Sequence, residues 1–343
     1  ARAPRARAAP PWHEGPWRRQ AAARRSGRMP HALLLCGPQG VGKGGFARAL
    51  ARAMLCESPV ADGGACGGCR HCALFDAGTH PDAFFLAPAE DSNFILVDQV
   101  RELGDFLQLK SQLGGYKVAV LDPADKLNPN AANSLLKGLE EPPPGTLILL
   151  LSDRPGWIPA TVRSRCQRVM LAPPPAAEAA AWLAGQGIAA AEAHACLSLA
   201  QGAPMRALVL ATGGGGADRQ GLFRDLTAVI QGRADAVATA EAWLKSDLAQ
   251  ALYWLYTWTV DLIRLRAAPA PPVLVNADLR QDLLHLAQKM DITALYSRLD
   301  QLHEAMLAVD SSVNKQLLLE ELLLAWSPQG AHTPQPIQSA GRR

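Results

Sequence analysis

The sequence predicts an α/β domain built on a parallel sheet, followed by two all-helical domains. Apolar runs typical of strands alternate with helical patterns between residues 31 and 172. This order is expected when helices cover both faces of a parallel sheet. Beyond the segment "APPPAA" (172–177) the strand pattern stops. The length of 343 residues allows two or three domains.

The first domain is expected over residues 1–173 and contains all of the predicted strands. These strands are the runs "HALLLC" (31–36), "DAFFLA" (82–87), "KVAVLD" (117–122), "LILLLS" (147–152) and "QRVMLA" (167–172). Helical patterns occupy 43–55 and the stretches near 97–109 and 129–140. The domain therefore begins with a strand, a glycine-rich loop and a helix, which is the context in which phosphate-binding loops occur.

Two linkers divide the helical part of the chain. The first is "APPPAA" (172–177), and the second is the glycine run at 213–216. Residues 174–213 are expected to form a small lid-like domain of short helices, and 217–327 a larger helical domain that ends in "NKQLLLEELLLAW". The tail 328–343 is polar, contains Pro and Gly, and is expected to be disordered.

The composition and the apolar runs argue against secretion and membrane insertion, but they do not identify a binding partner. A net charge of +3 and 19% charged residues do not require a nucleic-acid partner. The longest apolar runs, such as "LILLL" (147–151), are too short to span a membrane. The basic N-terminal "ARAPRARAAP" leads into no apolar signal core. We therefore expect neither secretion nor a membrane partner.

The stretch "GPQGVGKGG" (37–45) fits the phosphate-loop pattern G-x-x-x-x-G-K-S/T except at its last position. In such a loop the backbone N–H groups cradle phosphates, the lysine neutralises them and the final hydroxyl holds Mg²⁺. Here Gly44 stands where the hydroxyl belongs, which removes that ligand. The residues that keep the pattern are Gly37, Gly40, Gly42 and Lys43.

A second acidic motif, "VAVLDPADKL", departs from the ATPase pattern as well. Asp122 can bind Mg²⁺, but Pro123 stands where related ATPases place a water-activating Glu. Two parts of the hydrolysis apparatus are thus missing together, and this favours a degenerate nucleotide site over an active one. The loop, its context between a strand and a helix, and the acidic strand together favour descent from a nucleotide-binding domain over an unrelated glycine turn. Whether nucleotide still binds, and whether Asp125 compensates for Pro123, is left open by the sequence.

The segment "CESPVADGGACGGCRHC" (56–72) carries a C-x9-C-x2-C-x2-C array. Two thiolates of a C-x2-C pair reach one ion from a tight turn, and four thiolates complete a tetrahedral Zn²⁺ site with no open position. We predict a structural zinc site, and prefer it to free thiols or disulfides because the spacing is specific. Its ligands would be Cys56, Cys66, Cys69 and Cys72.

Several segments together resemble the clamp-loader branch of AAA+ proteins. They are the phosphate loop, the four-cysteine insert in the same domain, "NAANSLLKGLEEPPPGTLILLLS" and "IPATVRSRCQRVMLAPP". The resemblance covers residues 10 to 327, and "SLLKGLEEPP" and "SRC" are highly specific to this branch. It implies an AAA+ parallel-sheet domain, a helical lid domain and an all-α collar domain that mediates assembly.

The resemblance also implies roles for three residues. Arg165 of "SRC" would be an arginine finger that reaches the ATP of a neighbouring subunit. Ser152 would stand at the sensor-1 position and Arg206 at the sensor-2 position. The plain alternatives are a surface arginine paired at a helix end for Arg165 and a helix-surface charge for Arg206.

The leading hypothesis is a non-hydrolysing structural subunit of a cytoplasmic, hetero-pentameric clamp loader. Its partners would be gamma/tau and delta subunits and, through the complex, the sliding clamp and primer-template DNA. One alternative is an active gamma-type ATPase or a related AAA+ DNA-processing protein, which Gly44 and Pro123 oppose. Another is a zinc-containing DNA-binding module. Its basic cluster would be Arg18, Arg19, Arg24, Arg25 and Arg28, which is equally consistent with a solvated helix face.

Overall fold

The computed structural model describes residues 9–89, 92–213, 215–268, 270–271, 273–309 and 313–328. The chain divides into two compact units. The first comprises residues 1–193 and 202–208, and the second 194–201 and 209–343. The tail predicted to be disordered, 328–343, lies outside the described residues except for Pro328.

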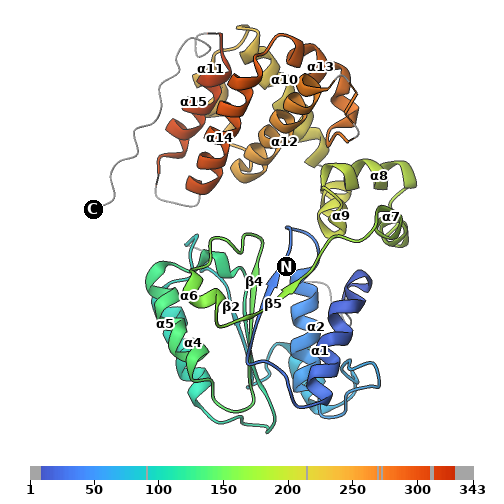
Figure 1. The fold of residues 1–343 in the computed structure, drawn as a ribbon, viewed down its shortest axis with the longest axis vertical. Helices are drawn as coiled ribbons and strands as arrows, with labels where there is room; N and C mark the ends of the chain where they lie inside the picture. The colour runs from blue at the N-terminus through green and yellow to red at the C-terminus, as the bar shows by residue number, and fades with distance from the viewer. Residues whose placement is uncertain are drawn as a thin grey trace. The chain divides into compact units, whose positions relative to one another are not determined.

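The first unit is built on a five-stranded sheet whose paired strands are all parallel, which confirms the predicted fold class. The strand order is β2-β3-β4-β1-β5, and all five strands lie at the predicted runs (Figure 1). Their bounds are Ala32–Cys36 (β1), Ala83–Leu86 (β2), Lys117–Leu121 (β3), Thr146–Ser152 (β4) and Gln167–Met170 (β5).

Helices cover both faces of this sheet, with α4 and α5 on one side and α1 and α2 on the other (Figure 1). Strand β1 explains why, because successive side chains of a strand point to opposite faces. Leu34 packs into the core beneath α4 and α5, and Leu33 and Leu35 pack into the core beneath α2. The helices are α1 (Glu14–Arg25), α2 (Lys43–Leu55), α3 (Arg70–Ala77), α4 (Val97–Gln108), α5 (Pro129–Glu140), α6 (Ala160–Arg163) and α7 (Ala176–Gly185), with 3-10 turns η1 (Pro11–His13) and η2 (Ala124–Lys126).

The carboxyl ends of β1, β3 and β4 meet at one edge of the sheet, because the strands are parallel and neighbours in the order. Cys36 is in register with Ser152. The glycine loop after β1, Asp122 after β3 and Asp153 after β4 therefore start from the same edge. Ligands of open α/β sheets bind at this kind of edge.

The remainder of the described chain is helical, as predicted. Three helices lie within 174–213, where short helices were expected. The division into two units passes through the second and third of them, and an independent lid domain stays a prediction. Helix α10 begins at Gly215, inside the run predicted as a linker. The helices are α8 (Ala190–Leu199), α9 (Pro204–Thr212), α10 (Gly215–Ile230), α11 (Ala236–Trp243), α12 (Leu248–Ala267), α13 (Arg280–Gln288), α14 (Ile292–Ala308) and α15 (Lys315–Trp326), with the 3-10 turn η3 (Ala277–Leu279).

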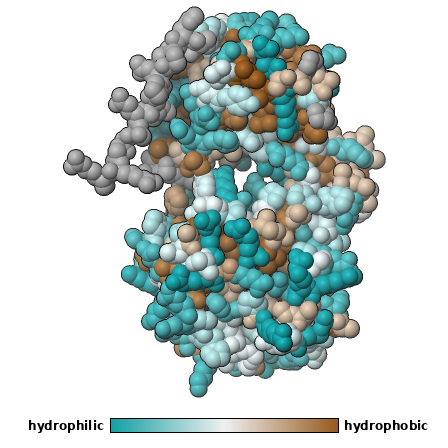
Figure 2. Space-filling model, in the orientation of Figure 1, coloured by the Kyte–Doolittle hydropathy of each residue, from teal (hydrophilic) through white to brown (hydrophobic). Residues whose placement is uncertain are grey.

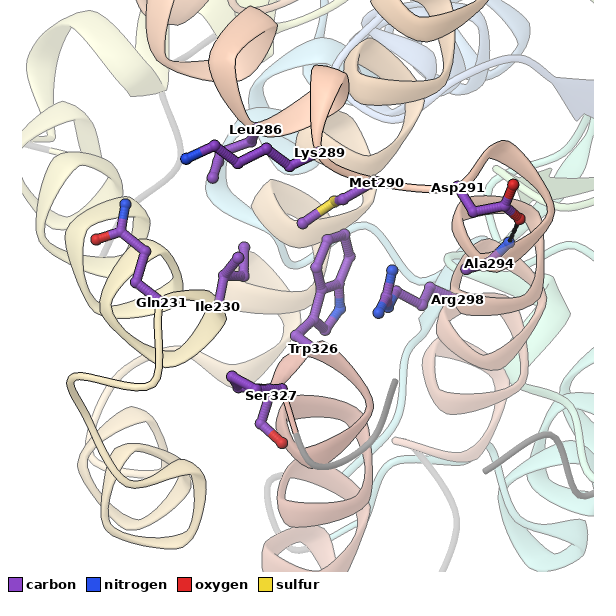
Figure 3. A pocket seen from close by; sticks show the side chains of 11 residues that line it. Ile230, Gln231, Leu286, Lys289, Met290, Asp291, Ala294, Arg298, Trp326 and Ser327 are labelled. Atoms are coloured by element: carbon purple, nitrogen blue, oxygen red, sulfur yellow. Dashed lines mark hydrogen bonds between the residues drawn. The ribbon is translucent and has the colours of Figure 1, made fainter. Parts of the chain in front are cut away.

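The second unit packs its helices around buried tryptophans. Trp254 and Trp258 of α12 are both fully buried, and Trp243 of α11 is 1% exposed. A pocket of about 460 Å³ opens between α10, α13, α14 and α15 (Figure 3). Among its lining side chains, the guanidinium of Arg298 lies 4.8 Å from the ring centre of Trp326, and Arg298 Nε donates to the carbonyl of Ala325 at 2.9 Å. These contacts hold the last described helix against α14.

Helix α15 also presents apolar side chains to solvent. Leu317 is 60% exposed and Leu324 is 39% exposed. They lie two turns apart on the same face of the helix. Hydrophobic residues lie between hydrophilic residues on the visible surface of the helical unit (Figure 2). An apolar stripe on an outer helix is a feature of surfaces that contact another protein.

Candidate metal centre and nucleotide loop

The four predicted metal ligands lie together. The sulfur atoms of Cys56, Cys66, Cys69 and Cys72 are all within 4.8 Å of one another, and those of Cys56 and Cys69 are 3.9 Å apart. A tetrahedral Zn²⁺ with bonds of about 2.3 Å places its sulfur ligands about 3.8 Å apart. The cluster therefore fits a four-coordinate metal ion with all positions filled by the chain.

Local backbone geometry positions these sulfurs. Cys56 is the C-cap residue that follows α2, Cys69 caps the N-terminus of α3, and Cys72 lies in the first turn of that helix. The N–H of Cys66 donates to Cys56 Sγ at 3.3 Å, and the N–H of Cys72 donates to Cys69 Sγ at 3.4 Å. N–H groups that point at sulfur stabilise thiolates, which are the form that binds metal.

The thiols of the cluster differ in acidity. Backbone N–H groups of Gly68 and Cys69 lower the pKa of Cys66 to about 6. Burial raises the pKa of Cys72 to about 12. Cys66 is thus the thiol that deprotonates first, and a bound cation would favour loss of the remaining protons.

Two buried histidines join this cluster to the sheet instead of binding metal. The N–H of Asp82 donates to Nδ1 of His80, so His80 carries its proton on Nε2 and donates to Nδ1 of His71 at 3.1 Å. His71 Nε2 in turn faces Glu57 Oε1 at 3.0 Å. The chain of contacts runs from the residue after Cys56 to the start of β2. Local sequence offered no signal for it.

The glycines of the loop are required by close contacts. Gly40 and Gly42 have positive φ angles of 79° and 97°, a region that other residues rarely adopt. A Cβ on Gly37 would lie 2.1 Å from the carbonyl oxygen of Leu171, and one on Gly40 would lie 2.4 Å from Cβ of Arg206. The predicted sensor-2 residue, Arg206, therefore packs directly on the loop, where it also donates to Gln39 Oε1 at 3.2 Å.

Lys43, the lysine of the loop, is bound by its own chain. Its Nζ donates to the carbonyls of Gly37 at 2.9 Å and Pro38 at 3.0 Å, and it forms an ion pair with Asp153. An ammonium has three donors, so these contacts use its full capacity. The side chain is buried. Asp153 was not predicted, because a partner 110 positions away leaves no local pattern.

The metal-binding side of the loop has space but no hydroxyl. A Cβ on Gly44 would meet Asp122 Oδ2 at 3.5 Å, which is ordinary contact. Gly44 and Asp122 thus lie side by side as the loop motif requires. Ser152 is fully buried, and its hydroxyl accepts the N–H of Arg154 at 3.0 Å. Asp125 Oδ1 is buried without a hydrogen-bond partner among the described residues.

An N-terminal segment covers the loop, a feature not predicted from sequence. A Cβ on Gly42 would come within 2.8 Å of Pro10 Cγ. Trp12 Nε1 donates to the carbonyl of Val41 at 2.8 Å, and its ring meets that of Trp182 edge-on with centres 5.2 Å apart. The loop is therefore enclosed by parts of the chain that come before and after the sheet.

Arg165 is held by residues outside the glycine loop. Its guanidinium contacts Glu140 Oε1 at 2.5 Å and donates to the carbonyl of Thr161 at 2.9 Å. Its side chain is 35% exposed. None of its recorded contacts within the described chain is a residue of the loop. Geometrically it is a half-exposed arginine held by the last residue of α5.

Comparison with known proteins identifies the family. A family model described as "DNA polymerase III, delta subunit" matches residues 13–175, and one for the C-terminal part of that subunit matches 216–328. The chain is 36% identical over 319 residues to DNA polymerase III subunit delta' of Pseudomonas aeruginosa, covering 91% of this chain and 97% of that protein. It is 34% identical over 318 residues to the Escherichia coli K12 delta' subunit, with 92% and 94% covered. The E. coli tau subunit is 36% identical over 140 residues, or 41% of this chain and 21% of tau.

A parallel α/β unit with a phosphate-type loop, a four-cysteine module inside it and helices after it defines an AAA+ protein of the clamp-loader class. Within that class, the chain belongs to the family of DNA polymerase III delta' subunits. This confirms the resemblance inferred from the sequence. No helix among the described residues is both long and apolar enough to cross a membrane.

Proposed function

We propose that this chain is a non-hydrolysing, structural subunit of a clamp loader that contributes Arg165 to ATP bound by a neighbouring subunit. The observation that carries the proposal is the state of Lys43, whose three donors are all used within the chain. A loop in this state keeps the fold of a nucleotide site, but its lysine ammonium is not available to bind a phosphate.

The loop's chemistry supports the absence of turnover. Gly44 cannot hold Mg²⁺, and Pro123 has no carboxylate to orient water. A phosphate would also have to displace Asp153 from Lys43. Each of these would slow a reaction that depends on positioning and electrostatic stabilisation. We therefore assign the loop a scaffold role, with nucleotide bound weakly and not hydrolysed.

Arg165 supports a role in trans. It follows α6 on the surface of the first unit, and its contacts with Glu140 and Thr161 leave part of the guanidinium exposed. A planar guanidinium suits the charge that develops on a transferred phosphoryl group. Gamma or tau and delta subunits would be the neighbours, and the sliding clamp and primer-template DNA would be reached through the complex.

The cysteine cluster would hold one Zn²⁺ with a structural role. Four sulfurs leave no position for substrate, so the ion would act by joining α2, the insert and α3. Ser152 and Arg206 would remain as residues of the sensor positions without a hydrolytic task. Glycine replaces the magnesium ligand at 44, so no catalytic metal is assigned to this chain.

The test is to rebuild the complex from purified subunits with wild-type or Arg165→Ala chain. We expect no turnover by the isolated chain, normal assembly of the variant, and lower DNA-stimulated ATP hydrolysis by the complex. A decisive arginine finger contributes about 10³-fold or more, and fingers of other subunits would reduce the observed loss. Turnover by the isolated chain on the order of 1 s⁻¹ would favour the active-ATPase alternative. Unchanged ATPase and clamp loading at sub-saturating ATP would remove the trans role.

A further inference from the structure

A second concave site lies away from the loop, between α1, the turn that follows it and the edge strand β5. Its volume is about 370 Å³. Arg19 comes from α1, Arg28 from the turn and Arg168 from β5. The lining residues include these three arginines and no aspartate or glutamate. The cavity is therefore cationic, and low-dielectric walls strengthen such a potential.

In the part of the chain that the structure describes, the three arginines differ from their neighbours in having no hydrogen-bond or ion-pair partner. Arg18 pairs with Glu14, and Arg24 donates to the carbonyl of Cys56 at 3.1 Å. Within the described residues, by contrast, no hydrogen bond or ion pair engages the side chains of Arg19, Arg28 and Arg168. The basic cluster read from the sequence thus separates into arginines used by the fold and arginines left for a ligand.

Gln20 gives a second, independent indication of a ligand. It is only 3% exposed, and it lines the same cavity. Its amide forms no hydrogen bond with the part of the chain that the structure describes. The amide is not among the fully buried polar groups that lack a partner, so it reaches the open part of the cavity, where it has donors and an acceptor available. A ligand in the cavity could therefore form a hydrogen bond with Gln20 as well as with the arginines.

We propose that this cavity binds the phosphodiester backbone of DNA without reading its sequence. Guanidinium forks match phosphate oxygens. A single free phosphate would leave part of the charge of three arginines uncompensated, whereas successive backbone phosphates would not. No aromatic residue lines the cavity, so it lacks the stacking platform that a base requires. The chain would then contact DNA itself, in addition to the contacts made through a complex.

The test uses the full-length chain without partners or ATP and a fluorescein-labelled DNA duplex in an anisotropy titration over a range of salt concentrations. Each phosphate contact contributes about 0.9 to the salt slope, which is about eightfold in affinity at 0.1 M salt. Arg19→Ala should lose about that much. Arg18→Ala, its neighbour with the same charge change, should lose little because Arg18 is already paired.

Two further variants separate this site from general charge. Replacing Arg19, Arg28 and Arg168 together by lysine should keep most of the salt slope, whereas replacing them by alanine should lower it by about 2.7. Gln20→Met should weaken binding with the salt slope unchanged, because an amide neutralises no phosphate. Zinc content and thermal unfolding check that each variant is folded.

Equal losses for Arg18→Ala and Arg19→Ala would overturn the proposal, because binding would then follow net charge alone. A calorimetric titration with inorganic phosphate tests whether the site binds a free anion instead of DNA. If phosphate binds in an Arg19-dependent way and DNA does not, the site takes a free anion and the DNA assignment is wrong. Because no ATP or partner is present, either result is independent of the role proposed for Arg165.

Discussion

At the scale of single residues, the two cations to which we assign functional roles, Lys43 and Arg165, each form an ion pair within the chain. Lys43 is held by Asp153, and Arg165 is held by Glu140. In each pair a carboxylate holds a cation to which we assign a phosphate partner in the proposed function. Substituting Asp153 or Glu140 therefore tests the role proposed for Lys43 or for Arg165.

Freeing Lys43 should restore nucleotide binding without restoring hydrolysis. We expect Asp153→Ala to raise the affinity for ADP or ATP about tenfold, equivalent to about 1.4 kcal/mol. Adding Gly44→Ser should make binding dependent on Mg²⁺, because a Cβ at 44 contacts Asp122 without a clash. Calorimetry measures binding, and a phosphate-release assay should stay at background because Pro123 is unchanged. Equal affinity of wild type and Asp153→Ala would show that the ion pair does not control the loop.

Glu140→Gln tests whether Glu140 restrains Arg165. A partly exposed ion pair contributes up to about 1 kcal/mol. We therefore expect the rebuilt complex to show up to about a fivefold lower KM for ATP with kcat little changed. In an Arg165→Ala background the same substitution should have no effect, since the restrained group is gone. A change of equal size in both backgrounds would mean that Glu140 acts by another route.

At the scale of elements, the cysteine module joins the end of α2 to the start of α3. Cys69→Ser removes one ligand and part of the N-cap of α3. We expect zinc to fall well below one ion per chain and the segment 56–72 to exchange its amides faster than the sheet. Elemental analysis and hydrogen exchange measure both effects. Cys196→Ala, outside the cluster, is the control and should change neither zinc nor exchange at 56–72.

Asp82 anchors the loop before β3, and its contribution should depend on pH. Burial tends to raise its pKa, but N–H groups of Gln112 and Leu113 and the hydroxyl of Ser111 outweigh this and hold the pKa below its usual value. The folded pKa is therefore lower than the unfolded one. Its stabilisation is present above the unfolded pKa of about 3.9 and is lost as pH falls through the folded pKa.

Asp82→Asn should accordingly lower the free energy of unfolding by about 1–3 kcal/mol at pH 7, because an amide presents donors to donors. The difference between variant and wild type should shrink as the pH is lowered below about 4. Urea unfolding at both pH values measures it, and groups that titrate in both proteins cancel in the difference. A difference that is independent of pH would assign the effect to packing alone.

At the scale of the whole molecule, the exposed leucines of α15 should matter for assembly and not for folding. Leu317 is 60% exposed, so Leu317→Glu should change the stability of the isolated chain by no more than about 0.5 kcal/mol. It should weaken association with the other subunits at least about tenfold if α15 lies in an interface. Size-exclusion chromatography of mixed subunits measures this. Val273→Glu, at a position 63% exposed in the same unit, is the control, and equal losses would remove α15 from the interface.

The parts predictable from sequence were those encoded locally. The strands were readable as apolar runs, and the last helix as "NKQLLLEELLLAW". The cysteine ligands lie close in sequence, and they meet as expected. Asp153 on Lys43 and Glu140 on Arg165 were not predictable, because such pairs depend on how distant segments pack. The same holds for Arg168, which joins arginines that precede it by more than a hundred positions.

The order of the sheet has a consequence for synthesis of the chain. Strand β1 lies between β4 and β5 and ends at Cys36, but β5 ends only at Met170. The 134 residues from Gly37 to Met170 (170 − 36) take roughly 7 to 27 s to translate at about 5–20 residues per second. For most of that time the "ALLLC" strand has no neighbour on either side, because β4 ends only at Ser152. The first strand of the sheet to be synthesised is therefore among the last to gain both of its neighbours, and a chaperone that binds such segments would have its main opportunity there.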